Sequence, residues 1–132
     1  MLRKAVVLLL CLAPPAAMGA EMTCKKSPAL TGQCSTVKGS LGLTPGIGVT
    51  VISEDGSRII IKAPPNSNAD IATPVMQNWL YWQSKTGSMR TRITGTFEIC
   101  PLPPAINSAG IKDFGCINKG SRISQDKSSP AS

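Results

Sequence analysis

The chain has 132 residues, a net charge of +7 at pH 7, five cysteines and no histidine. The absence of histidine excludes Ser-His-Asp triads, Cys-His pairs and histidine-bearing metal motifs. The length fits one small domain, for which disulfides would contribute materially to stability.

The first 20 residues have the composition of an export signal. The basic pair Arg3 and Lys4 precedes a short apolar stretch at 5–13, and two prolines and small residues lead to Ala20. The apolar stretch is much shorter than the roughly 20 residues that a membrane span needs. A buried N-terminal helix is the alternative, but the two prolines disfavour it. We therefore predict a periplasmic or secreted protein without a membrane span.

Removal of this signal would leave 12 basic and 7 acidic residues, a net charge of +5. Such an excess favours anionic partners, among them acidic proteins, anionic glycans and lipid headgroups. A mildly basic surface without a specific partner is the ordinary alternative. Export makes nucleic acid an unsuitable partner, so we expect none.

Four cysteines follow the signal, an even number that suits a disulfide framework in an oxidising compartment. They are Cys24, Cys34, Cys100 and Cys116. Three connectivities are possible, and the sequence alone does not choose among them. We favour Cys24–Cys34 and Cys100–Cys116, because each closes a short loop rich in proline, glycine or serine. Zinc is the competing use of four cysteines, but no Cys-x-x-Cys pair is present, and we expect no metal or cofactor.

Residues 35–43, 47–53 and 58–63 have the short alternating pattern of β-strands. A Thr-Pro-Gly turn separates the first two segments. Asp55 and Gly56 predict a tight hairpin between the second and the third, because that turn needs positive φ.

The segment from Pro74 to Lys85 carries apolar residues at helical spacing. The spaced residues are Val75, Trp79 and Trp82. Thr73 suits the N-cap, proline suits the first turn, and Gly87 suits the end of the helix. A strand through the two tryptophans is the alternative, since aromatic residues also favour strands.

Two further strands are expected at 89–99 and 114–123. In the first, the inward side chains would be Met89, Thr91, Ile93, Phe97 and Ile99. Arg90 and Arg92 would then face outward, and Gly95 suggests a bulge. Cys100 and Pro101 are expected to end this strand. The polar segment 124–132 is expected to be a loose tail.

Three strands, a helix and two strands form the order that an OB-fold uses. We therefore predict a mainly β domain over residues 21–123. It would be a five-stranded OB-like barrel with one helix between strands 3 and 4, stapled by two disulfides. Another small β-sheet with a helix packed on it is the alternative.

Three short segments resemble parts of small exported OB-like domains of Gram-negative bacteria. Thr31 to Leu41 (TGQCSTVKGSL) resembles their cysteine-bearing opening strand, and Phe97 to Leu102 (FEICPL) resembles their Phe-x-x-Cys-Pro segment. Phe114 to Ile117 (FGCI) resembles their closing strand. The resemblance covers roughly half of the chain after the signal. It implies a compartment and a fold, and no activity.

The architecture is also similar to that of the B subunits of bacterial AB5 toxins, which are exported, disulfide-bonded OB-folds. No shared residue motif accompanies this second similarity, and fold alone does not imply function.

The residues most suited to a binding surface are an aromatic cluster and a set of cations. The aromatic residues are Trp79, Tyr81 and Trp82, and the cations are Arg90, Arg92 and Lys62. The two tryptophans are expected to lie mainly in the core, whereas Tyr81 falls off the apolar stripe and is the better candidate for exposure. Arg90 and Arg92 lie two apart on one expected strand, so both would emerge on one face, which Lys62 could join.

No pair of carboxylates and no nucleophile with a base stands out in the sequence. We therefore predict a noncatalytic exported binding module that contacts a protein partner in the manner of an inhibitor or immunity protein. A glycan-binding, ring-forming subunit similar to the toxin B subunits is the alternative. An envelope enzyme with a new kind of site is a third possibility.

Overall fold

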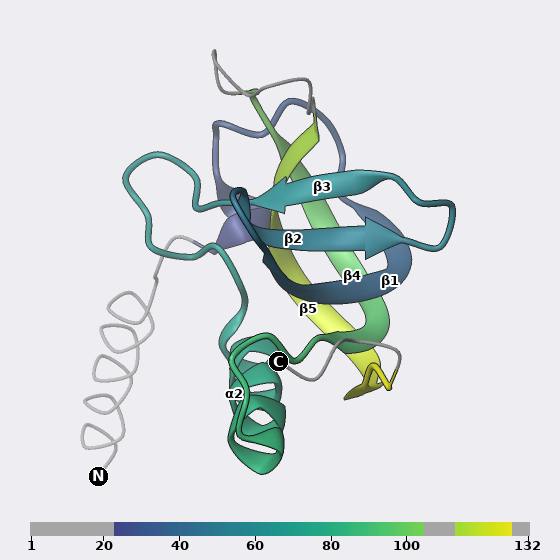
Figure 1. The fold of residues 1–132 in the computed structure, drawn as a ribbon. Helices are drawn as coiled ribbons and strands as arrows, with labels where there is room; N and C mark the ends of the chain where they lie inside the picture. Colours follow the sequence, from purple (N-terminus) through teal and green to yellow (C-terminus); the bar gives the residue numbers. More distant parts are fainter. Residues whose placement is uncertain (1–22, 105–112, 128–132) are drawn as a thin grey trace, which may run out of the picture.

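The computed structural model describes residues 23–104 and 113–127, so the expected export signal lies outside the described residues. The elements, in chain order, are η1 (Cys24–Lys26), β1 (Ser35–Thr44), β2 (Gly48–Ser53), β3 (Arg58–Ile61), α2 (Thr73–Thr86), β4 (Ile93–Leu102) and β5 (Asp113–Gln125) (Figure 1).

The five strands close into a barrel in the order β1-β2-β3-β5-β4. β3 and β5 are parallel, and the other neighbouring strands are antiparallel. The barrel closes because β1 pairs with two strands: Gly39 lies opposite Ser53 of β2 and also opposite Gly95 of β4. The prediction of a mainly β, five-stranded barrel with one helix between β3 and β4 is confirmed.

The main core fills the inside of this barrel. Its buried members are Leu41, Val51, Ile61, Ile71, Val75, Trp79, Ile93, Phe97, Ile99 and Ile117. α2 lies at the lower end of the barrel in Figure 1 and contributes Val75 and Trp79 to this core. The indole N–H of Trp79 donates a hydrogen bond to the carbonyl of Thr91 at 2.9 Å, which satisfies the one polar group of this large side chain.

The favoured disulfide pairing was wrong: the bonds are Cys24–Cys116 and Cys34–Cys100. Cys100 and Cys116 lie opposite each other in the β4–β5 register. Because their neighbours Ile99 and Ile117 point into the barrel, both cysteines point to its outer face. There each one bonds to a cysteine of the N-terminal segment rather than to the other.

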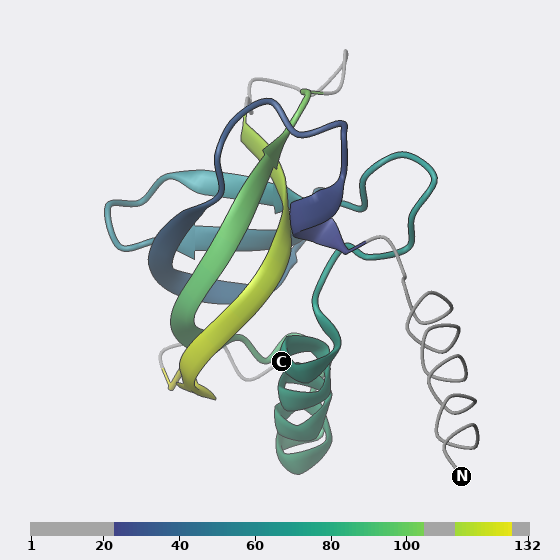
Figure 2. The ribbon, with the colours of Figure 1, turned by 180° about the vertical axis from the view of Figure 1, so that it is seen from behind.

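We call the segment Cys24–Cys34 the N-terminal strap. It lies beside the upper parts of β4 and β5 before the chain enters β1 (Figure 2). Beneath it is a second apolar cluster on the outside of the barrel, with buried members Cys24, Cys100, Leu102, Phe114 and Cys116. Ala29 and Leu30 of the strap pack on this cluster.

β4 differs from its expected bounds at both ends. It begins at Ile93 rather than Met89, and Met89 is 70% exposed instead of facing inward. It also continues past Cys100. Pro101 fits because its carbonyl accepts a hydrogen bond from the Thr31 amide at 3.0 Å, so its missing N–H faces the strap and not the β5 ladder.

Two smaller features of the barrel concern its bends. The register between β4 and β5 shifts between Thr94 and Thr96, and the extra residue lies on β5, opposite the Gly95 position where a bulge or bend was expected. The β2–β3 hairpin turns through Gly56, whose φ of 92° confirms the prediction from Asp-Gly. β5 runs to Gln125, so the first residues of the expected tail belong to the barrel.

Candidate binding sites

Tyr81 is 55% exposed on α2, beside Leu80, which is 53% exposed. Met89, in the segment that follows the helix, is the third large apolar side chain that is exposed among the described residues. The side-chain amide of Gln83 donates to the Met89 carbonyl at 3.1 Å and holds this segment against α2. Arg90, also exposed, comes next. We use the name α2 patch for the exposed side chains of Leu80, Tyr81, Met89 and Arg90, of which Arg90 also lines a hollow with the β1–β2 turn.

The two tryptophans behave differently from Tyr81. Trp79 is 4% exposed and belongs to the core. Trp82 is half-buried against the same core, and the Tyr81 ring packs on it edge-on with ring centroids 5.1 Å apart. The contact with Trp82 therefore restricts the orientations that the Tyr81 ring can adopt.

Arg92 does not join Arg90 on a surface. The expectation of one face failed because β4 begins only after Arg92, and Arg92 is 8% exposed. Its side chain lies across Gly42 of β1, where any Cβ would come within 2.5 Å of the Arg92 side chain. Arg92 is therefore a structural residue.

The Arg92 guanidinium satisfies backbone carbonyls at the point where β1 leaves β4. It donates to the carbonyls of Ser40 at 2.8 Å, Thr50 at 3.1 Å and Leu43 at 3.3 Å. Burial lowers the pKa of Arg92, and the negative charge of Asp126 opposes that effect. The planar fork of arginine spreads its donors over three nitrogens and so reaches acceptors at separate positions, whereas all donors of lysine radiate from one nitrogen.

Lys62 lies at the end of β3, in surroundings different from those of both arginines. Its ammonium donates to the carbonyl of Pro103 at 3.0 Å and lies 4.7 Å from the centroid of the Phe114 ring. The structure thus brings together Tyr81 and Trp82, and places Lys62 and Arg92 with separate partners.

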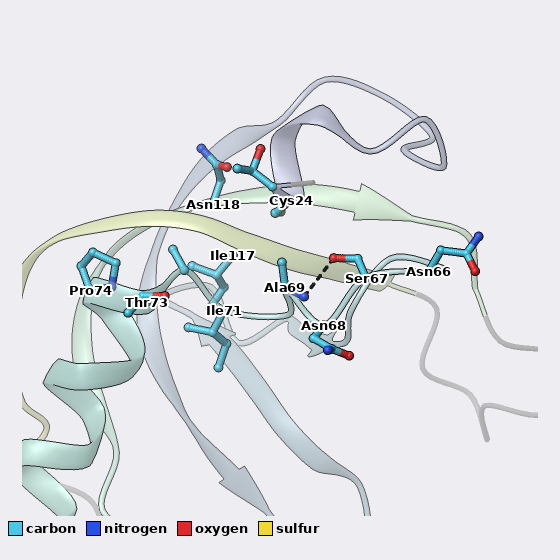
Figure 3. Close-up of a pocket in the computed structure, with 12 residues that line it drawn as sticks. Cys24, Asn66, Ser67, Asn68, Ala69, Ile71, Thr73, Pro74, Ile117 and Asn118 are labelled. Carbon is cyan, nitrogen blue, oxygen red and sulfur yellow. Dashed lines mark hydrogen bonds between the residues drawn. The ribbon is translucent and has the colours of Figure 1, made fainter. Parts of the chain in front are cut away.

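A groove of about 860 Å³ lies between the β3–α2 loop, η1 and β5. Figure 3 shows Ile71 and Ile117 near its middle, with Thr73 and Pro74 at one end. Its lining residues are Thr23, Cys24, Asn66, Ser67, Asn68, Ala69, Ile71, Ala72, Thr73, Pro74, Ile117 and Asn118. None of them is charged.

Both walls of the groove are fixed to three consecutive residues of β5. The loop is held at its start by the Lys62 amide bonding to the Gly115 carbonyl at 2.9 Å, and at its end by the Ile117 amide bonding to the Asp70 carbonyl at 2.8 Å. The other wall, η1, is held by the disulfide from Cys116 to Cys24. The barrel therefore fixes the positions of both walls of the groove.

Beside the groove, Glu98 forms a small polar network with the strap. The Asn118 side chain donates to Glu98 Oε1 at 2.8 Å, and Lys25 Nζ lies 3.5 Å from Glu98 Oε2. The hydrogen bond from Asn118 lowers the pKa of Glu98, and the charges of Lys25 and Lys119 add to the effect. The Asn118 oxygen also accepts from the Lys25 amide at 3.2 Å, so this side chain ties η1 to β4.

Sequence reasoning missed the groove. Its only signal is Pro-Pro-Asn-Ser-Asn after β3, which is typical of a loop and says nothing of the strap beside it.

Within the described ranges, no cluster of acidic and cysteine side chains could hold a metal ion, and no helix is long and apolar enough to cross a membrane. No protein-family model, curated protein or solved structure matches the chain.

Proposed function

We propose that this protein is a noncatalytic exported binding module and that it contacts a protein partner through the α2 patch. The observation that carries the proposal is the position of the exposed large apolar side chains. In the described part of the chain, all three lie on α2 or within three residues of its end.

The composition of the patch supports a protein contact. Tyrosine, methionine and arginine are enriched at protein interfaces relative to other surfaces, and tyrosine and arginine often carry most of the binding energy. Tyr81 loses little conformational freedom on binding because Trp82 already restricts it. The exposed guanidinium of Arg90 adds a charge that suits an acidic partner.

The cross-links support the expected compartment. Two disulfides tie the N-terminal strap to the barrel, and such bonds persist in oxidising compartments outside the cytosol. With the export signal expected at residues 1–20, they support a site of action in the bacterial envelope or outside the cell.

Photocrosslinking in producing cells tests the proposal. A photoreactive phenylalanine analogue at position 81 should give one discrete protein adduct. The same analogue at Thr36, which is exposed on β1, serves as the control. With the purified partner, Tyr81→Ala should weaken binding by about tenfold or more, as for an interface hot spot. Equal adducts from both positions, or no adduct from position 81, would refute the α2 patch as the contact.

The ring-forming alternative makes a different prediction about mass. A ring requires several copies in solution, whereas a module that binds another protein can be a monomer. Sedimentation equilibrium over a wide concentration range separates the two. A single species of one-chain mass supports the proposal, and a stable oligomer with the α2 patch at its interface would replace it.

A further inference from the structure

The groove between the β3–α2 loop and η1 differs in charge from the chain as a whole. The protein carries a net positive charge, yet none of the described residues that line the groove is charged. Its polar groups are amides and hydroxyls, which both donate and accept hydrogen bonds. A groove of this kind gives an ionic ligand no counter-charge, so it favours an uncharged ligand.

Two of these polar groups have their hydrogen-bonding capacity open. The side-chain amides of Asn66 and Asn68 are exposed, and neither has a hydrogen-bond partner in the part of the chain that the structure describes. Asn118, by contrast, uses its oxygen for the Lys25 amide and its nitrogen for Glu98. The two loop amides therefore have more free hydrogen-bonding capacity than Asn118, which already uses one donor and one acceptor position.

The apolar part of the groove is too well covered to drive binding by burial. Ile71 is 6% exposed and Ile117 is 0% exposed, so a ligand can remove little more of their surface from water. Ile71 gives the C–H face of a ligand a small apolar contact, and Ile117 lies beneath the surface. Most of the specificity must then come from hydrogen bonds to the loop.

An extended peptide fits this groove poorly. A peptide that binds along a strand needs an unpaired strand edge. At the groove, β5 has partners on both sides: Ile117 pairs with Ile99 of β4 and is bridged to Ile71 of the loop. A molecule with many hydroxyl groups needs no strand edge, because amide side chains can bond its hydroxyls directly.

We propose that this groove binds a neutral oligosaccharide at a site separate from the α2 patch. Its volume of about 860 Å³ lies in the range of small-molecule sites and accommodates two or three sugar rings. Its described lining residues include no aromatic ring, so the affinity is expected to be in the millimolar range.

Amide NMR spectra of the oxidised protein, recorded with added trisaccharides, test this proposal. The neutral probes are maltotriose and chitotriose, and trigalacturonate is a probe of the same length that carries carboxylates. At about 10 mM, a Kd of about 1 mM gives near saturation. We expect saturable shifts with at least one neutral probe, confined to residues 66–73 and 117–118, and weaker shifts with trigalacturonate.

A double variant tests the role of the loop amides. Asn66→Gly with Asn68→Ala should weaken binding about fivefold or more, since each lost hydrogen bond contributes modestly. Glycine is used at position 66 because the φ of 63° there strains alanine but not glycine. Gln77→Ala removes an exposed amide from α2 outside the groove and should leave binding unchanged. Both variants should keep the melting temperature of the parent protein, because the three residues are not buried.

The proposal would be overturned by the absence of saturable shifts with both neutral probes, by stronger binding of trigalacturonate, or by shifts centred on α2. Unchanged affinity in the double variant would overturn the role of the loop. The crosslink from position 81 is independent of these results, because neither Asn66 nor Asn68 belongs to the α2 patch. The failure of one site can thus be told from the failure of the other.

Discussion

The barrel interior and the strap cluster are both apolar and both buried, yet they are held together in different ways. Inside the barrel, nine of the ten buried residues come from strands and a helix whose backbones are already paired, and the tenth, Ile71, is bridged to β5. Outside it, the strap has only the three-residue helix η1 as regular structure, and it covers Leu102 and Phe114. Two disulfides tie its ends to β5 and β4.

The difference shows where covalent bonds contribute most in a small domain. A side chain in a paired strand is already positioned for packing, so burial alone stabilises it. An irregular segment must be ordered before it can pack, and the loss of backbone freedom opposes this strongly. The cysteines occur at the two ends of such a segment. Burial and cross-linking therefore act on different parts of the molecule, and the two can be perturbed separately.

The largest effect is expected inside the barrel. Phe97 is 0% exposed, and its ring fills the space left by Gly95 and Gly120, where a Cβ would come within 3.3 Å of the ring. Phe97→Ala should lower the free energy of unfolding by about 3–5 kcal/mol, measured by urea denaturation. Tyr81→Ala, a change of an exposed aromatic residue, is the control and should cost about 0.5 kcal/mol or less.

Removal of one cross-link should produce a smaller and more local effect. Cys24→Ser with Cys116→Ser frees the start of the strap and should cost about 2–4 kcal/mol. Hydrogen exchange should rise in the strap and in residues 113–116, while β1 and β2 remain protected. Equal acceleration in β1 and β2 would contradict the separation of the two clusters.

A third perturbation concerns Arg92. This buried side chain stabilises β1 and β2 through hydrogen bonds to their backbone carbonyls. Arg92→Lys keeps the charge but cannot reach the carbonyls of Ser40, Leu43 and Thr50 together. We expect a loss of about 2 kcal/mol in thermal or urea unfolding. Arg90→Lys, two residues away and exposed, is the matched control and should be near neutral.

The smallest effect should come from the β2–β3 hairpin, which belongs to neither cluster. Hydrogen bonds from the Ser53 side chain and from the amide and side chain of Ser57 lower the pKa of Asp55 from 3.8 to about 2. The charged carboxylate therefore stabilises the hairpin above pH 3.8, and this contribution is lost as the pH falls towards 2. NMR titration of the Asp55 carboxyl should give the lowered pKa, and Asp55→Asn should remove the transition. A carboxyl that titrates near 3.8 would contradict these hydrogen bonds.

Much of the fold was accessible from the sequence because local patterns carry it. Alternation placed all five strands to within a few residues, and Asp55-Gly56 placed the hairpin correctly. Helical spacing and Pro74 gave α2 nearly its full length. These features depend on residues close together in the chain, where side-chain period and turn chemistry act directly.

The errors arose where distant segments meet. The disulfides were assigned by loop length, whereas the β4–β5 register brings Cys100 and Cys116 to one outer face and leaves both to the strap. Arg92 was expected at the surface because the strand was taken to begin at Met89. The groove combines η1, a loop and β5, so no single stretch of sequence contains it.

The order of the cysteines along the chain has a consequence for production of the protein. A chain that crosses a membrane with its N-terminus first exposes Cys24 and Cys34 to oxidant while both native partners are still behind them. Oxidation at that stage joins the wrong pair, and recovery requires attack by a free thiolate on that bond. The yield of native protein should therefore depend on a disulfide isomerase or on late oxidation. It should rise most when β5 has crossed the membrane before the oxidant acts.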